Sequence, residues 1–146
     1  MHTVLYFSPQ HLAYETRVFD LSDIAELTGG HLLDSLASAD RQFDFWFDSS
    51  LPGSTRPVNL DATETLMATT CFNPRTVPLL RGGVVVGTHR PDGTLGSIDR
   101  NQLDQLTQRS CVVLPRHERA LARRISREDR HRLHLAATGT AHPASP

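Results

Sequence analysis

The residues best placed to do chemistry in this sequence are arginines that recur every three or four positions near its C-terminal end. An α-helix turns about 100° per residue, so residues spaced in this way lie along one face of a helix. A row of guanidinium groups is suited to anions, and to phosphate above all, because each planar group offers several N–H donors. The predicted anion- or partner-binding residues are Arg116, Arg119, Arg123, Arg127 and Arg130, with His134 extending the row.

Three interpretations of this arginine row remain open. It is the solvated outer face of a helix that packs through Leu121 and Ile125, it docks on the chain's own acids or a second subunit, or it binds nucleic acid, a nucleotide or an acidic host protein. Residues 1–99 contain six arginines and twelve acidic residues, whereas residues 100–146 contain nine arginines and four acidic residues. This asymmetry is typical of a basic segment that contacts something anionic.

A second candidate is the strand predicted around Trp46. Residues 43–48 alternate between phenylalanine on one face and Asp44, Trp46 and Asp48 on the other. The second face is expected to meet solvent, and an exposed tryptophan is a common anchor of protein interfaces, so Trp46 is predicted to mark a partner patch. Asp44 and Asp48 would stand about 13 Å apart, too far for the paired carboxylates of a glycosidase.

Other patterns that carry chemistry are absent from the sequence. His131 and His134 are three residues apart, but no further ligand stands at a motif spacing, so no metal site is predicted. The glycines of residues 82–87 lack the lysine of a phosphate-binding loop, and no serine stands in a nucleophile motif. Cys71 and Cys111 are expected to be reduced and packed as small hydrophobic residues. We therefore predict no catalytic residue and no cofactor.

The elements that position these residues predict an α+β fold with a mainly antiparallel sheet and flanking helices. Strands are expected over residues 3–7, 14–19, 31–36 and 43–48, with a hairpin over 84–98. Helices are expected to begin at Asp20, at Asp61 with Glu64, and at Asp99 with Gln102, and Gly29-Gly30 is expected to end the first. Residues 1–114 form the predicted core, 115–138 a basic C-terminal helix that ends near Gly139, and 139–146 a disordered tail. Residues 111–114 are expected to be a last strand or a linker.

Short motifs, most of them containing glycine, mark several of these boundaries. They are Gly29-Gly30 after the first helix, Asn59 with Ala62-Thr63 at the second, and Gly83-Val84-Val85-Val86-Gly87 followed by Asp92-Gly93 in the hairpin. In this order they resemble a family of uncharacterised small proteins, a domain of unknown function common in actinobacteriophages and other mobile elements. The resemblance covers residues 3–106 and omits the arginine row. It implies a phage or mobile-element origin and no particular reaction.

The chain of 146 residues is long enough for one domain. It has no apolar run near the roughly 20 residues that span a bilayer, and its N-terminus lacks the features of a signal peptide, so a cytoplasmic protein of the host bacterial cell is expected. We expect a non-enzymatic accessory protein that binds a host or phage macromolecule or an anionic ligand, for example in counter-defence or host takeover. The alternatives are a nucleic-acid-binding protein that uses the arginine row, a structural homo-oligomerisation module such as a homodimer whose C-terminal helix packs against its copy, and an enzyme whose site is assembled from distant residues.

Overall fold

The computed structural model of the protein describes residues 1–50 and 54–141, and for Cys111 and residues 136–141 it describes the backbone alone. Its strands are β1 (His2–Phe7), β2 (Ala13–Val18), β3 (Leu33–Ala37), β4 (Asp44–Asp48), β5 (Val84–His89) and β6 (Leu95–Gly96). Its helices within these ranges are α1 (Leu21–Thr28), α3 (Leu60–Ala68), α4 (Arg100–Cys111) and α5 (Pro115–Ala141). The predicted α+β fold with an antiparallel sheet is confirmed.

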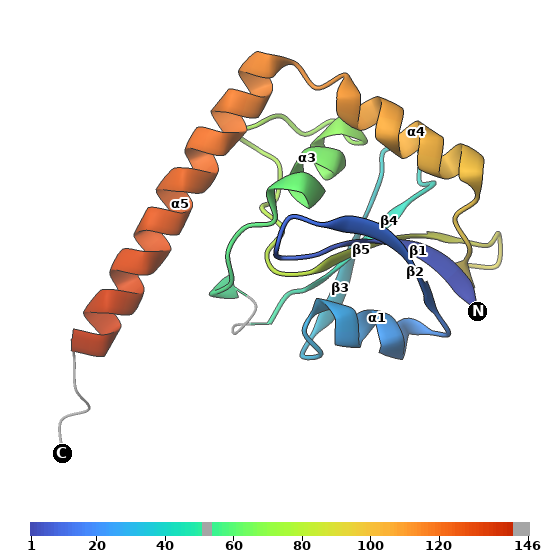
Figure 1. Cartoon of the computed structure of the whole chain (residues 1–146), viewed down its shortest axis with the longest axis horizontal. Coiled ribbons are helices and arrows are strands. Elements are labelled where there is room, and N and C mark those ends of the chain that lie inside the picture. Colours follow the sequence, from blue (N-terminus) through green and yellow to red (C-terminus); the bar gives the residue numbers. More distant parts are fainter. Residues whose placement is uncertain (51–53, 142–146) are drawn as a thin grey trace.

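The described strands form one six-stranded sheet. Five of them lie side by side in the order β2-β1-β5-β4-β3, and β6 pairs with the end of β5. Every pairing is antiparallel. Helix α1 lies on one face of this sheet, and α3 and α4 lie over the other face (Figure 1). The domain therefore has three layers, with the sheet in the middle.

The main core lies between the sheet and helices α3, α4 and α5. Residues directly opposite each other on antiparallel strands share a face, which places Leu5, Phe45 and Val86 together. The predicted burial of the phenylalanine face is confirmed for Phe43 and Phe45, which have no exposed surface. The helices contribute Ala62, Leu66, Leu106, Leu121 and Ile125 to the same cluster.

The opposite face of the sheet was expected to meet solvent, but α1 covers part of it. Trp46 lies across from Val85 and is half-buried against a cluster that includes Ile24 of α1. Asp48, on the same face of β4, is only 5% exposed. The prediction that this face meets solvent is therefore wrong for Trp46 and Asp48. The short amphipathic helix needs an apolar surface on which to bury Ile24, and this face supplies it.

Two of the three predicted helix starts are confirmed. Asp20 caps α1 by accepting hydrogen bonds from the backbone N–H groups of Ser22 and Asp23. Asp99 and Gln102 form the predicted capping box of α4. Helix α3 instead begins at Leu60, and its N-cap is Asn59, two residues before the predicted cap at Asp61. Asparagine caps as well as aspartate does, and Asp61 then lies in the first turn, where its charge favours the helix dipole.

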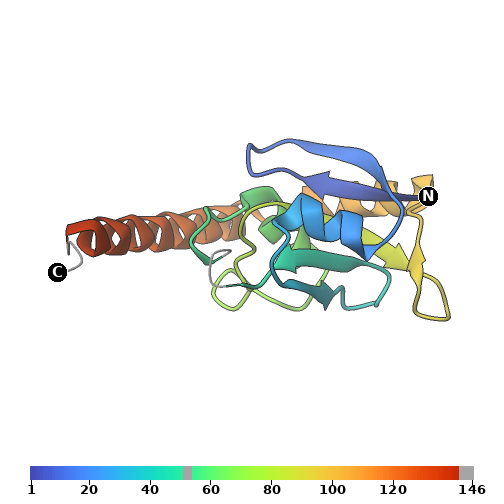
Figure 2. The same ribbon diagram turned by 90° about the horizontal axis from the view of Figure 1, so that it is seen from below.

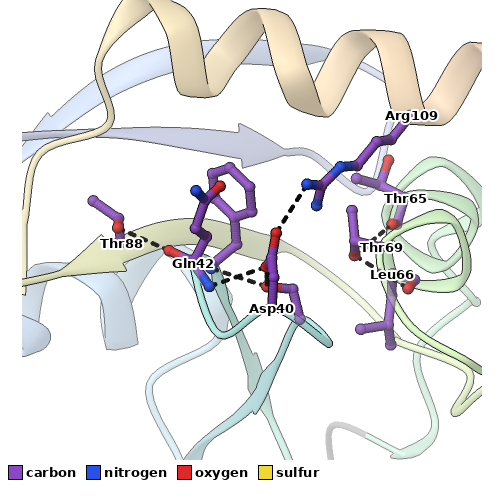
Figure 3. Close-up of polar contacts among 9 residues, drawn as sticks. Asp40, Gln42, Thr65, Leu66, Thr69, Thr88 and Arg109 are labelled. Atoms are coloured by element: carbon purple, nitrogen blue, oxygen red, sulfur yellow. Dashed lines mark hydrogen bonds and ion pairs between the residues drawn. The ribbon is translucent and has the colours of Figure 1, made fainter.

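Polar contacts tie α4 and β5 to the turn between β3 and β4 (Figure 3). Arg109 of α4 donates from Nη2 to Asp40 Oδ2 at 2.8 Å. Asp40 also accepts from the Ser38 hydroxyl and the Gln42 backbone, and Thr88 of β5 donates to the Gln42 carbonyl. Burial raises the pKa of Asp40, but these hydrogen bonds and the charge of Arg109 outweigh it and hold the pKa below its ordinary value. The anchored α4 leads through residues 112–114, a linker and not a strand, into α5.

Helix α5 is 27 residues long and leaves the body of the domain as a projecting rod (Figure 2). It continues through Gly139 to Ala141, so the predicted end at Gly139 and the start of the predicted tail are wrong. A glycine inside a helix costs about 1 kcal/mol relative to alanine, which does not by itself end the helix. The remainder of the predicted tail, residues 142–146, lies outside the described residues.

Candidate anion-binding face of helix α5

The inner face of α5 attaches the helix to the domain. Leu121 is fully buried and Ile125 is 8% exposed, and both belong to the main core. Arg124 donates from Nη1 to the carbonyl oxygens of Pro74 and Val77, at 3.0 and 2.8 Å. Because the chain itself covers Leu121 and Ile125, these two residues are not a free surface for pairing with a second copy of the helix.

Further along α5, charged contacts join the helix to the rest of the domain. The guanidinium of Arg81 lies 4.0 Å from carboxylate oxygens of both Glu128 and Asp129. Arg132 donates to the backbone carbonyl of Thr55 at 3.0 Å, and its Nε lies 3.8 Å from Asp129. Each of these ion pairs is long and contributes little alone. Together with Arg124 they fix which side of α5 faces the domain.

The opposite side of α5 carries the predicted arginine row. We call five of its residues the arginine face: Arg116, Arg119, Arg123, Arg127 and Arg130. All five side chains are exposed, and none forms an ion pair or side-chain hydrogen bond within the described part of the chain. His134 is exposed one turn beyond the last of them. A shallow hollow of about 360 Å³ lies over Ala122 and Ser126, beside three of these arginines.

This arrangement answers one of the open interpretations of the row. The arginine face does not dock on acidic residues in the described part of its own chain. Contacts between α5 and the domain are instead made by Arg124 and Arg132, which donate to backbone carbonyl groups, and by Arg81, which lies near Glu128 and Asp129 of the helix. What separates the two groups is their position around the helix, because Arg124 and Arg132 lie on the side of Leu121 and Ile125.

The strand around Trp46 forms contacts that sequence reasoning missed. Asp44 Oδ2 lies 2.8 Å from Nδ1 of His89, on the neighbouring strand β5. Asp48 accepts hydrogen bonds from the backbone N–H groups of Leu32 and Ser50, at 3.1 and 3.0 Å. Asp44 and His89 are 45 residues apart, so only the pairing of β4 with β5 brings them together. Alternation along the two strands places both on one face, but the register needed to pair them is not readable from either strand.

The structure brings together no group of three or more metal-ligating side chains among the described residues, and His131 and His134 gain no third ligand there. Cys71 is a free, exposed thiol in the bend after α3, so the expectation that it packs as a hydrophobic residue is wrong. The side chain of Cys111 lies outside the described part.

Within residues 1–50 and 54–141, no helix is both long and apolar enough to cross a membrane. No family model matches the chain, and neither does any curated protein or solved structure. The resemblance noted from the sequence therefore stays a prediction, and the geometry of α5 carries the functional argument.

Proposed function

We propose that this protein binds nucleic acid through the arginine face of α5. The observation that carries the proposal is that all five arginines are exposed and have no acidic partner in the described residues, on a chain whose first 99 residues contain twelve acids. The arginines that hold the helix in place lie on its other side. The face is therefore free to meet an external anion.

The dimensions and energetics of the face suit a phosphate backbone. Arg116 and Arg130 are separated by about 21 Å along the helix axis, which matches about six phosphates of one strand at a rise of 3.4 Å. Like charges three or four residues apart destabilise an isolated helix by a few tenths of a kcal/mol per pair, and an anionic partner removes that repulsion. We propose that these guanidinium groups contact phosphates, which carry no sequence information, so we expect binding that does not depend on sequence.

The setting we propose is that of a phage or mobile-element accessory protein acting in the cytoplasm of a host cell, which is what the sequence resemblance implies. In this proposal the protein acts by binding and not by catalysis. Its acidic remainder is repelled by the same polyanion that attracts α5, so the molecule approaches nucleic acid with the helix leading.

The proposal is tested by replacing Arg119, Arg123 and Arg127 with alanine. A matched control replaces Arg17, Arg75 and Arg100, three exposed arginines outside α5, so that both variants lose the same charge. Fluorescence anisotropy with a labelled duplex and a labelled single strand at low salt measures the affinity. We expect at least a tenfold loss for the first variant, and a much smaller loss for the control.

A pull-down from host lysate, with and without nuclease, identifies what the face binds. Nucleic acid that depends on these three arginines for capture supports the proposal. If no nucleic acid binds and an acidic protein is retained after nuclease treatment, the nucleic-acid proposal is wrong and the face serves a protein partner.

A further inference from the structure

A second site lies on the face of the sheet that carries α1. There a cavity of about 530 Å³ opens between the start of α1 and the turn that joins β5 to β6. Its walls comprise residues 19–21, Asp44 and Trp46 of β4, residues 88–90 and 92–95, and His2 of β1. It is larger than the hollow on α5. Two of the segments that line it, the start of β1 and the turn between β5 and β6, lie at the end of the domain away from the projecting end of α5 (Figures 1 and 2).

The charge of this cavity is negative. Asp20, Asp44 and Asp92 line it against a single arginine, Arg90, which gives a formal charge of −2 with the histidines neutral. The helix end that faces it offers nothing to an anion, because the Asp20 carboxylate already accepts hydrogen bonds from two N–H groups of the first turn. The cavity therefore favours a positively charged ligand.

Its apolar surface is suited to the same kind of ligand. Trp46 is half-buried in the wall, and Phe19 and Leu21 stand at the rim with 67% and 45% of their surfaces exposed. Aromatic rings attract cations through their negatively charged faces, and tryptophan does so best. Apolar side chains exposed beside carboxylates would bind the hydrocarbon part of a ligand whose charged end meets an aspartate.

Nothing in the cavity points to covalent chemistry. The Thr88 hydroxyl donates to the Gln42 carbonyl, and the Thr94 hydroxyl donates to Asp92 within the same turn, where the backbone N–H of Thr94 donates to Asp92 as well. His89 is held by Asp44 at 2.8 Å. This pair fixes the Asp44 carboxylate in the wall, where it can accept a hydrogen bond from a ligand.

We propose that this cavity binds an organic cation: a protonated amine or a guanidinium group carried on an apolar body. The aromatic wall takes the apolar body, and Asp44 and Asp92 take the charge. The ligand is either a free amine or the side chain of a lysine in a peptide. The proposal is independent of nucleic-acid binding by α5.

Trp46 is the only tryptophan of the chain, so its fluorescence reports on this wall alone. Phenethylamine, 2-phenylethanol and phenylacetate share a phenyl body and differ in charge. We expect saturable quenching or a spectral shift with phenethylamine, a weaker response with the alcohol, and none with the acid. A lysine tripeptide that is acetylated and amidated at its ends distinguishes a peptide ligand from a free amine. If the fluorescence responds to this peptide at a lower concentration than to phenethylamine, the site is assigned to a peptide.

Two variants locate the binding. Asp44→Asn removes the charge but keeps an acceptor for His89, and Phe19→Ala removes a ring that is mostly exposed. Each is expected to weaken phenethylamine binding about fivefold or more, whereas Asp104→Asn, an exposed aspartate of α4, leaves it unchanged. Circular dichroism checks that each variant is folded. Any of three results would overturn the proposal. They are equal responses to the amine and the acid, no response to any probe at millimolar concentration, and equal binding of phenethylamine by Phe19→Ala and the parent.

Discussion

At the scale of single residues, buried Asn59 joins three parts of the chain. Its Nδ2 donates to the carbonyl oxygens of Phe7 and Gly82, at 3.0 and 2.9 Å, and lies 3.3 Å from that of Ser8. Its Oδ1 accepts from the backbone N–H of Ala62 and so caps α3. Only a side chain with both a donor group and an acceptor group can make this set of contacts, which explains why an asparagine stands here.

Asn59→Ala is expected to lower the free energy of unfolding by about 2–4 kcal/mol, because it removes the cap of α3 and leaves buried carbonyl groups without a donor. Urea denaturation followed by circular dichroism measures the change. Asn101→Ala, an exposed asparagine in the first turn of α4, is the matched control and should change stability by less than about 0.5 kcal/mol. Equal effects of the two substitutions would show that the contacts of Asn59 do not stabilise the fold.

Asp48 makes the stability depend on pH. Burial raises the pKa of Asp48. Hydrogen bonds from Ser50 and Leu32 and the charge of Arg56, 3.7 Å away, lower this pKa by more than burial raises it, so the pKa lies below the ordinary value of 3.8. A carboxylate whose pKa is lower in the folded state stabilises the protein above its unfolded pKa and loses this effect as the pH falls through the folded value.

Asp48→Asn is therefore expected to destabilise the protein by about 1–3 kcal/mol at pH 7, with a smaller difference from the parent at pH 3. Urea denaturation at the two pH values measures it, with Asp104→Asn as a control for the loss of one charge. A difference that stays constant between pH 7 and pH 3 would contradict the role given to the ionised Asp48.

At the scale of the elements, the position of α5 depends on a small apolar contact. Leu121 has no exposed surface, whereas Leu133 on the same helix is 57% exposed. Leu121→Ala is expected to cost about 2–4 kcal/mol, and Leu133→Ala less than about 0.5 kcal/mol, although both remove the same atoms from the same helix. Thermal or urea unfolding measures both. If the two substitutions cost the same, α5 is not docked through Leu121.

The sequence predicted those elements whose signals are local. Four such signals depend on residues close together in the chain, and all four features are present. They are the caps at Asp20 and Asp99, the end of α1 at Gly29 and the hairpin formed by β5 and β6. The arginine face followed from helical spacing in the same way. What could not be predicted depends on contacts between distant residues.

Three particular errors show this dependence. The start of α3 was misplaced because the partners that hold Asn59 lie on β1 and before β5. Trp46 was expected in solvent because the docking of α1 on its face leaves no pattern within β4. The cavity beside Trp46 was not foreseen, since it forms only where residues from four parts of the chain meet.

At the scale of the whole molecule, charge is divided between an acidic body and a basic outer face of α5. The mutual repulsion of the arginines gives the helix no stability, and an anion bound from outside the chain, as we propose, would relieve it. Replacing three of them by alanine, the best helix former, is therefore expected to leave the unfolding free energy unchanged or slightly higher while weakening nucleic-acid binding at least tenfold. Thermal unfolding followed by circular dichroism measures the stability of the triple variant. A variant that is unfolded or much less stable than the parent would show instead that the arginine face is structural.

The salt dependence of nucleic-acid binding tests the central claim most directly. If all five arginines of the arginine face neutralise phosphates, the logarithm of the association constant falls with the logarithm of the salt concentration with a slope near −4.5, and near −1.8 after replacement of Arg119, Arg123 and Arg127. Anisotropy titrations over a range of salt concentrations give both slopes. Association that does not depend on salt, or a slope that is the same for the parent and the triple variant, would contradict the account.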